Sequence, residues 1–184
     1  MTLGLIMNKY RMIGYVAIIA AAASFAGCAD SHQLLRAGNK LTKLDPSKTV
    51  YISVPQDGKY DQVHYQGSGV NATQIILLAF SKHSRFIESG HQYQSFDNAL
   101  AYVKENNYDY LVFPTLLEWE DRATEWSGRP DKASLTISII DSNSGVTIDS
   151  ALIKGKSGLA TLGGDHPQDL LQQPVEEYVD ELYL

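Results

Sequence analysis

The run from Tyr108 to Leu117 is apolar almost throughout, and such a run predicts a strand that is covered on both faces. Pro114 interrupts it and has no amide hydrogen, so we expect a bulge or a sheet edge nearby. Further along, Leu135, Ile137 and Ile139 alternate with hydroxyl residues, and a turn over 141–145 leads into a second β-rich stretch at 146–153. This pattern predicts an antiparallel hairpin. The chain must therefore build its core on a β-sheet.

Helical and strand patterns alternate before and after this region. We expect strands at 49–54 and 85–88, a helix capped by Asn71, a helix capped by Ser95 and a closing helix that Pro174 kinks or divides. The predicted fold class is α/β (α+β): a single domain with a twisted mixed β-sheet and packed helices, including a hairpin in the C-terminal half and a closing helix.

The amino-terminal segment has the charge pattern of an export signal. Lys9 and Arg11 precede an uncharged segment at 12–23, which is shorter than the roughly 20 residues that span a bilayer. Small residues then lead to Cys28, the single cysteine. We expect residues 1–27 to be a signal peptide, starting at Met1 or at Met7.

The stretch Phe25-Ala26-Gly27-Cys28 resembles the lipobox of bacterial lipoproteins. The resemblance implies that Cys28 carries a diacylglycerol thioether and that the new amino terminus is acylated, commonly with palmitate. An ordinary secretory leader with an incidental cysteine is the alternative. By resemblance to known sorting rules, Ala29 in place of an aspartate favours the outer membrane over the inner one. We therefore expect a lipid-anchored protein that faces the periplasm.

The remaining chain divides into residues 28–48, predicted as a lipidated amino terminus and tether, and residues 49–184, predicted as one periplasmic domain. Leucines in the tether could dock part of it on the domain. Of the 15 basic residues, Lys9 and Arg11 leave with the signal peptide, while all 21 acidic residues remain. The resulting acidic surface disfavours nucleic acid as a partner.

Two segments carry a family resemblance: Asn107-Tyr108-Asp109-Tyr110-Leu111-Val112, and the hairpin turn from Ile140 to Val146. They are similar to the amino-terminal domain of TolB and to the periplasmic domain of the curli-secretion lipoproteins. With the leader and residues 119–126, the chain also resembles a family of Gram-negative lipoproteins known as a domain of unknown function. These resemblances imply a fold and no activity. The sequence shows no amphipathic barrel strands, so it does not predict the pore of the curli channel subunit.

Catalytic and metal-binding patterns are weak, so the sequence predicts no catalytic residue, no cofactor and no metal site. The five histidines have no close ligand spacing. Gly67-Ser68-Gly69 could hold an anion at a helix start, but it lacks the remaining residues of the phosphate-binding and nucleophile-elbow motifs. Four neighbouring carboxylates include a candidate acid/base pair: Glu118, Glu120, Asp121 and Glu125. Arg122 and Arg129 lie in the same segment and instead favour a solvated loop with salt bridges.

Both tryptophans fall in this charged segment, and tryptophan with arginine is typical of interface hot spots. We predict an interface at Trp119, Arg122, Trp126 and Arg129, the alternative being that one or both tryptophans fold into the core. The expected function is a non-enzymatic envelope module that binds a protein partner in assembly or trafficking. The alternative is a ligand-binding or hydrolytic module, with the 55–71 loop and the tryptophan loop as its cleft.

Overall fold

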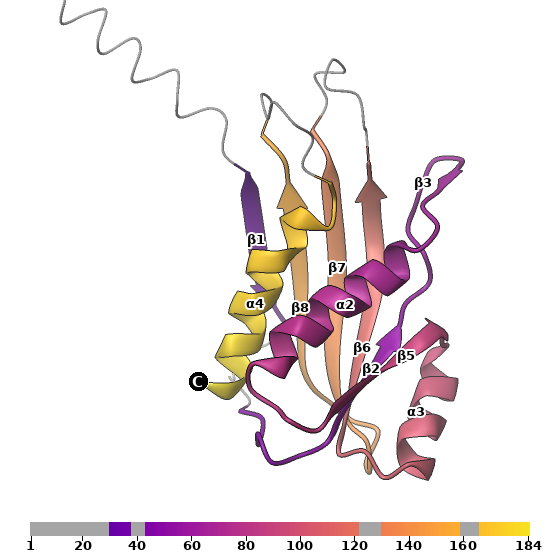
Figure 1. The fold of residues 1–184 in the computed structure, drawn as a ribbon, viewed down its shortest axis with the longest axis vertical. Coiled ribbons are helices and arrows are strands. Elements are labelled where there is room, and N and C mark those ends of the chain that lie inside the picture. The colour runs from indigo at the N-terminus through magenta and orange to yellow at the C-terminus, as the bar shows by residue number, and fades with distance from the viewer. Residues whose placement is uncertain (1–29, 38–42, 122–129, 159–165) are drawn as a thin grey trace, which may run out of the picture.

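The computed structural model describes residues 30–37, 43–121, 130–158 and 166–184. Within these ranges the strands are β1 Ser31–Arg36, β2 Val50–Val54, β3 Lys59–Tyr60, β4 Val63–His64, β5 Ile87–Tyr93, β6 Tyr110–Glu120, β7 Lys132–Asp141 and β8 Thr147–Lys156. The helices are α2 Ser68–Ser81, α3 Phe96–Glu105 and α4 Asp169–Tyr183 (Figure 1). The main sheet has the strand order β1-β8-β7-β6-β2-β5, and β3 pairs with β4 in a separate hairpin. The expected fold class, a mixed sheet with packed helices, is confirmed.

The half of the sheet formed by β5, β2 and β6 is parallel. Helix α2 connects β2 to β5 on one side of it, and α3 connects β5 to β6 on the other. Because such crossovers are right-handed, two that run in opposite directions along a sheet place their helices on opposite faces. The buried apolar side chains accordingly form two clusters, one on each face of the sheet. Helix α2 contributes to the larger core cluster, and α3 packs Ala99 and Val103 in the smaller one.

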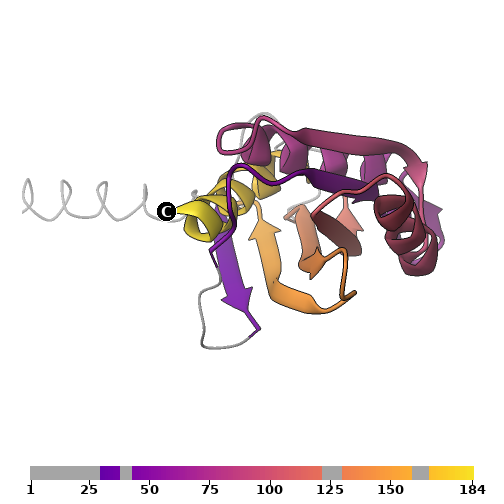
Figure 2. The ribbon, with the colours of Figure 1, turned by 90° about the horizontal axis from the view of Figure 1, so that it is seen from below.

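The other half of the sheet is antiparallel, and the predicted hairpin is confirmed as β7 and β8. Leu135, Ile137 and Ile139 point toward α2 and α4 and are buried, as their alternation predicts. On the opposite face, the Ser138 and Ser150 hydroxyls lie 3.2 Å apart. Figure 2 shows α4 and β1 at one side of the sheet and α3 at the other. The antiparallel half is therefore covered by helices on one face.

The tether predicted over 28–48 needs a correction, because Ser31–Arg36 forms the edge strand β1, paired antiparallel with β8. Its even-numbered residues face α4: Leu34 packs on the core, and Arg36 binds Asp149 and Glu181. Leu44 is also buried in the core. The folded domain therefore begins well before residue 49. The predicted signal peptide and Cys28 lie outside the described residues.

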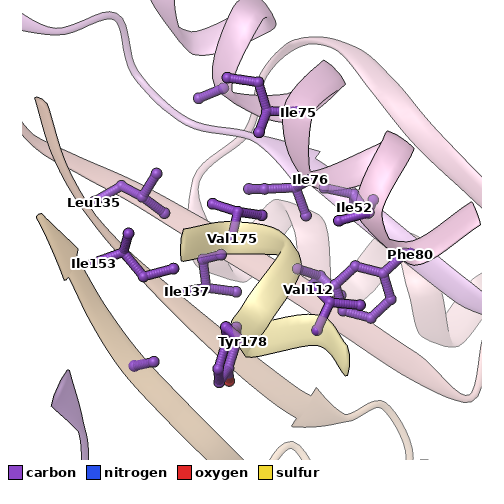
Figure 3. Close-up of a cluster of buried hydrophobic side chains, with 14 of the residues drawn as sticks. Ile52, Ile75, Ile76, Phe80, Val112, Leu135, Ile137, Ile153, Val175 and Tyr178 are labelled. Carbon is purple, nitrogen blue, oxygen red and sulfur yellow. The ribbon is translucent and has the colours of Figure 1, made fainter. Parts of the chain in front are cut away.

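The larger core cluster fills the space between the sheet and the helices α2 and α4 (Figure 3). Ile76 and Phe80 from α2 and Val175 from α4 meet side chains of four strands, which Figure 3 labels as Ile52, Val112, Leu135, Ile137 and Ile153. Tyr178 lies among them with no exposed surface. Burial of large apolar side chains at this scale is the main stabilising term of such a fold.

The helix boundaries follow local capping. The Ser95 side chain accepts a hydrogen bond from the Asn98 amide, which confirms the predicted cap of α3. Helix α2 begins at Ser68 and not after Asn71, because the Asp57 carboxylate accepts hydrogen bonds from amides at its start. Helix α4 continues through Pro174 without division, and β5 spans Ile87–Tyr93, later than the predicted 85–88.

Strand β6 confirms the irregularity that Pro114 predicts. Its partner β2 pairs only with Tyr110 to Val112, so beyond that point β6 has a free edge on this side of the sheet. The register with β7 then shifts between Leu116 and Glu118. A one-residue shift moves every later side chain to the other face.

No helix within the described ranges is long and apolar enough to cross a bilayer.

Candidate functional site

A cleft of about 280 Å³ lies where β6 continues past the end of β2. One wall is the segment that leaves β2, and the other is the free edge of β6 together with the end of β5. The lining residues are Pro55, Gln56, Asp57, Gly58, Lys59, Tyr93, Phe113, Pro114, Thr115, Leu116 and Leu117. The 55–71 loop thus contributes to a cleft, as one of the sequence hypotheses proposes, but the described residues opposite it come from β5 and β6 and do not include Trp119.

Asp57 occupies the amino terminus of α2. One carboxylate oxygen accepts a hydrogen bond from the Gly69 amide at 2.8 Å, and the other accepts one from the Gly67 amide at 3.1 Å. A helix amino terminus attracts anions, and here the chain supplies its own. The amides suggested by Gly67-Ser68-Gly69 as an anion site are already used within the protein.

Ser68 is only 2% exposed, and its hydroxyl oxygen accepts a hydrogen bond from the Gly58 amide at 2.8 Å. This bond fixes the loop after β2 against the first turn of α2. The hydroxyl is therefore buried and makes a structural contact, whereas a nucleophile would need access to substrate. Nothing in this geometry supports a hydrolytic role for Ser68.

Apolar side chains form the rim of the cleft. Tyr93 at the end of β5 is 57% exposed, and Leu117 on β6 is 56% exposed. Phe113 in the cleft wall makes an edge-to-face contact with the half-exposed Phe96, with ring centroids 5.3 Å apart. Exposed apolar side chains that gather in one place mark interaction sites more often than single ones do.

Trp119, a predicted interface residue, is instead part of the larger core cluster and only 3% exposed. A Cβ atom added to Gly58 would lie 2.5 Å from the Trp119 Cβ, so the tryptophan packs directly on the loop behind the cleft. For Trp119 the structure therefore supports the core alternative. The other predicted interface residues, Arg122, Trp126 and Arg129, lie outside the described residues.

The acidic residues near Trp119 form ion pairs. Lys132 Nζ lies 3.5 Å from Glu118 Oε1 and 3.6 Å from Glu120 Oε1, and Asp121 Oδ2 lies 3.6 Å from His166 Nδ1. These distances support the salt-bridged alternative for the three described carboxylates, while Glu125 lies outside the described residues.

Three histidines each meet one carboxylate: His32 meets Glu177 at 3.3 Å, His83 meets Asp180 at 2.6 Å and His166 meets Asp121. The His83 ring also stacks on Tyr183, with centroids 5.0 Å apart. Among the described residues, no group of three or more metal-ligating side chains gathers in one place. His32 and His83 thus contact carboxylates of α4. His166, which precedes α4, contacts a carboxylate just after β6.

Sequence reasoning missed Phe113 and Leu117, because both belong to a run that predicts full burial. The available signal was Pro114: where a proline ends pairing on one side, neighbouring side chains lose their cover. The cleft is thus built from positions whose exposure depends on the lengths of the neighbouring strands.

Comparisons with solved structures show the same fold elsewhere. The PelC dodecamer of Paraburkholderia phytofirmans matches with a TM-score of 0.63 and 12% identity, covering 83% of this chain and 97% of that one. A point variant of that PelC gives 0.62 and 12%, covering 83% and 99%. Lipoprotein GNA1162 of Neisseria meningitidis gives 0.49 and 12%, covering 73% and 97%. At these identities the PelC matches establish the fold alone. The resemblances to TolB and to the curli-secretion lipoproteins stay predictions.

A search of curated proteins found no match. The model of one family, described as "Domain of unknown function (DUF4823)", matches residues 42–182. This match covers the sheet from β2 to β8 and nearly all of α4, and it confirms the resemblance to a family of unknown function. The chain therefore belongs to the DUF4823 family.

Proposed function

We propose that this protein is a lipid-anchored envelope lipoprotein that faces the periplasm, and that it binds another envelope protein at the cleft beside β6 without catalysing a reaction. The observation that carries the proposal is the rim of Tyr93, Phe113 and Leu117 around a cleft whose carboxylate, Asp57, is held by α2. Aromatic and aliphatic side chains around a shallow cleft suit a protein surface.

The size and chemistry of the cleft favour a protein partner over a small substrate. Its volume of about 280 Å³ lies just below the range of typical ligand pockets. Among the residues that line it, the ionisable side chains are Asp57, Lys59 and Tyr93. A hydrolytic site would need a nucleophile and a base within hydrogen-bonding distance of each other, and the described lining offers no such pair.

The position of Cys28 supports the membrane anchor. The cysteine ends a lipobox-like stretch and stands three residues before the first residue of β1. An acyl anchor there would hold the domain close to the lipid surface and raise the effective concentration of a partner in the same membrane. Ala29 after the cysteine supports the outer membrane as the destination.

Labelling with a fatty-acid analogue tests the anchor. Cells that express the full chain should incorporate the label into this protein, and the Cys28→Ser variant should incorporate none and leave the membrane fraction. Membrane attachment of the Cys28→Ser variant equal to that of the native chain would contradict the proposal.

Photo-crosslinking in intact cells tests the binding site. A photoreactive amino acid at Tyr93 or Leu117 should give a discrete product with another envelope protein, whereas the same group at Phe86 or Val146 should not. These control positions are similarly exposed and are not part of the cleft lining. Equal products at all four positions would contradict a specific site. A product between two copies of this chain would assign the cleft to self-assembly, the arrangement that the PelC dodecamer represents.

A further inference from the structure

Three lysines gather on the face of the sheet that points away from α2 and α4. Lys132 on β7 stands directly opposite Lys156 on β8, and Lys154 lies two residues before Lys156 on the same face. Together with neighbouring residues they line a cavity of about 280 Å³, separate from the cleft described above. The remaining lining residues are Ser31, His32, Gln33, Glu118, Ala133 and Gly155.

This arrangement places like charges against each other. Two lysines directly opposite on neighbouring antiparallel strands destabilise a sheet. Lys132 has Glu118 and Glu120 near it, but at 3.5 and 3.6 Å both contacts are longer than ordinary charged hydrogen bonds. Lys154 and Lys156 are exposed and form no ion pair with any described residue. The three ammonium groups at the cavity therefore outnumber the Glu118 and Glu120 carboxylates beside them, on a chain of formal net charge −6.

The cavity also lies beside the segment that leads to Cys28. Ser31 pairs with Lys156, and Gln33 pairs with Lys154. Cys28 precedes Ser31 by three residues, so a fully extended backbone separates the two Cα atoms by at most about 11 Å. An acyl chain on Cys28 would hold this end of the sheet within reach of the lipid headgroups.

We infer that the cavity between Lys132, Lys154 and Lys156 binds the anionic headgroup of a glycerophospholipid in the membrane that holds the Cys28 anchor. The inference rests on the proposed lipid anchor and adds a second contact to it. Ammonium groups donate charge-assisted hydrogen bonds to phosphate oxygens. A basic patch next to an acyl chain is the combination that makes membrane attachment durable. The two contacts together would set the orientation of the sheet relative to the bilayer.

Lysine reactivity in reconstituted vesicles tests the inference on the intact, lipidated protein. An amine-acylating reagent followed by mass spectrometry reports each lysine separately. We expect Lys154 and Lys156 to react about threefold more slowly in vesicles that contain phosphatidylglycerol than in pure phosphatidylcholine vesicles. Lys82 and Lys104, which are exposed elsewhere, should react equally in both and serve as internal controls.

A pair of matched variants sharpens the test. Lys132 should lose its phosphatidylglycerol-dependent protection in the Lys154→Gln/Lys156→Gln variant and keep it in the Lys82→Gln/Lys104→Gln variant, which removes the same charge. Equal lysine reactivity in both kinds of vesicle, or loss of protection in both variants, would overturn the inference. Protection by inorganic phosphate in pure phosphatidylcholine vesicles would assign the cavity to free phosphate and overturn the lipid headgroup as its ligand.

The same mass spectra separate this inference from the proposed function. An amino-terminal peptide that lacks acyl mass on Cys28 would overturn both proposals. An acylated peptide combined with unchanged reactivity of Lys154 and Lys156 would overturn the headgroup site alone.

Discussion

Arg36 on β1 donates a hydrogen bond from Nη2 to Oδ2 of Asp149 on β8 at 2.6 Å, across a separation of 113 residues in the chain. The other oxygen of Asp149 accepts a hydrogen bond from the Tyr178 hydroxyl at 2.9 Å, and the Arg36 guanidinium lies over the Tyr178 ring. Burial opposes the charged form of Arg36, but hydrogen bonds to Asp149 and Glu181 outweigh it and raise the pKa of the guanidinium. The network joins the edge strand to α4.

Replacement of Arg36 should therefore destabilise the domain. Arg36→Ala leaves the Asp149 carboxylate, whose side chain is 4% exposed, without its cationic partner. Removal of one partner of a buried pair costs about 3 kcal/mol. Urea denaturation should show this loss, whereas Arg85→Ala, at an exposed position, should change the free energy of unfolding by less than about 0.5 kcal/mol. Equal effects of both variants would contradict the assigned role of Arg36.

Trp119→Ala should lower stability strongly. The side chain is buried in the larger core cluster, and truncation of a buried aromatic residue to alanine costs about 3–5 kcal/mol. Thermal denaturation followed by circular dichroism gives the measurement. Leu117→Ala, two residues earlier and exposed, is the matched control and should change the melting temperature little. A small effect of Trp119→Ala would restore the interface hypothesis for this residue.

Gly155→Ala should destabilise the contact between β8 and α4. An added Cβ would lie 2.5 Å from the Leu170 carbonyl oxygen and 2.6 Å from the Leu170 Cβ, so backbone would have to move. Such overpacking costs about 1–3 kcal/mol. Thr147→Ala, at an exposed position of the same strand, is the control for an alanine on β8 that meets no neighbouring backbone. The prediction fails if the two variants have the same urea midpoint.

Asp57→Ala should weaken the start of α2. It removes the acceptor of the Gly67 and Gly69 amides, and loss of a helix cap costs about 1 kcal/mol. Asp57→Asn keeps an oxygen acceptor but loses the charge, and it should retain part of the stability. Hydrogen exchange at the Gly69 amide should increase more in Asp57→Ala than in Asp57→Asn. Unchanged exchange in both variants would contradict the capping role.

Stability should fall in acid through Asp109. Burial alone would raise the pKa of this carboxyl, but hydrogen bonds from Lys48 and Thr49 outweigh it and lower the pKa below 3.8. A carboxyl with a depressed pKa stabilises the fold above its unfolded pKa, and this contribution is lost as the pH falls through the folded value. Asp109→Asn should therefore be less stable than the native chain near neutral pH, with the gap closing below about pH 4. Urea midpoints at both pH values measure it, and a constant gap would exclude this linkage.

The sheet and its hairpin were predictable because each follows from a local pattern. Alternation at Leu135, Ile137 and Ile139 defines the buried face of β7, and the Ser95 side chain caps α3 within three residues. The parallel direction of β2, β5 and β6 follows from the helices placed between them, since parallel strands need crossover connections. Local sequence contains the necessary information in these cases.

The placement of Trp119 and of β1 depends on distant partners. Without the register shift between Leu116 and Glu118, alternation from Val112 would place Trp119 on the opposite face, and the shift requires β7 as a partner. The six residues of β1 read as a polar linker, because Arg36 looks solvated until Asp149, Tyr178 and Glu181 surround it. The 55–71 loop was predicted as one wall of a cleft, but the wall formed by β6 was out of reach, because it depends on where β2 stops relative to β6.

The order of the sheet also fixes when the molecule can be completed. Both neighbours of β1 are encoded at the far end of the chain, in β8 and α4. A polypeptide that emerges from its amino terminus must hold residues 31–36 open until nearly the whole sequence has appeared. That delay keeps the edge of β8 open to other strands until α4 has appeared, so β1 completes the sheet last.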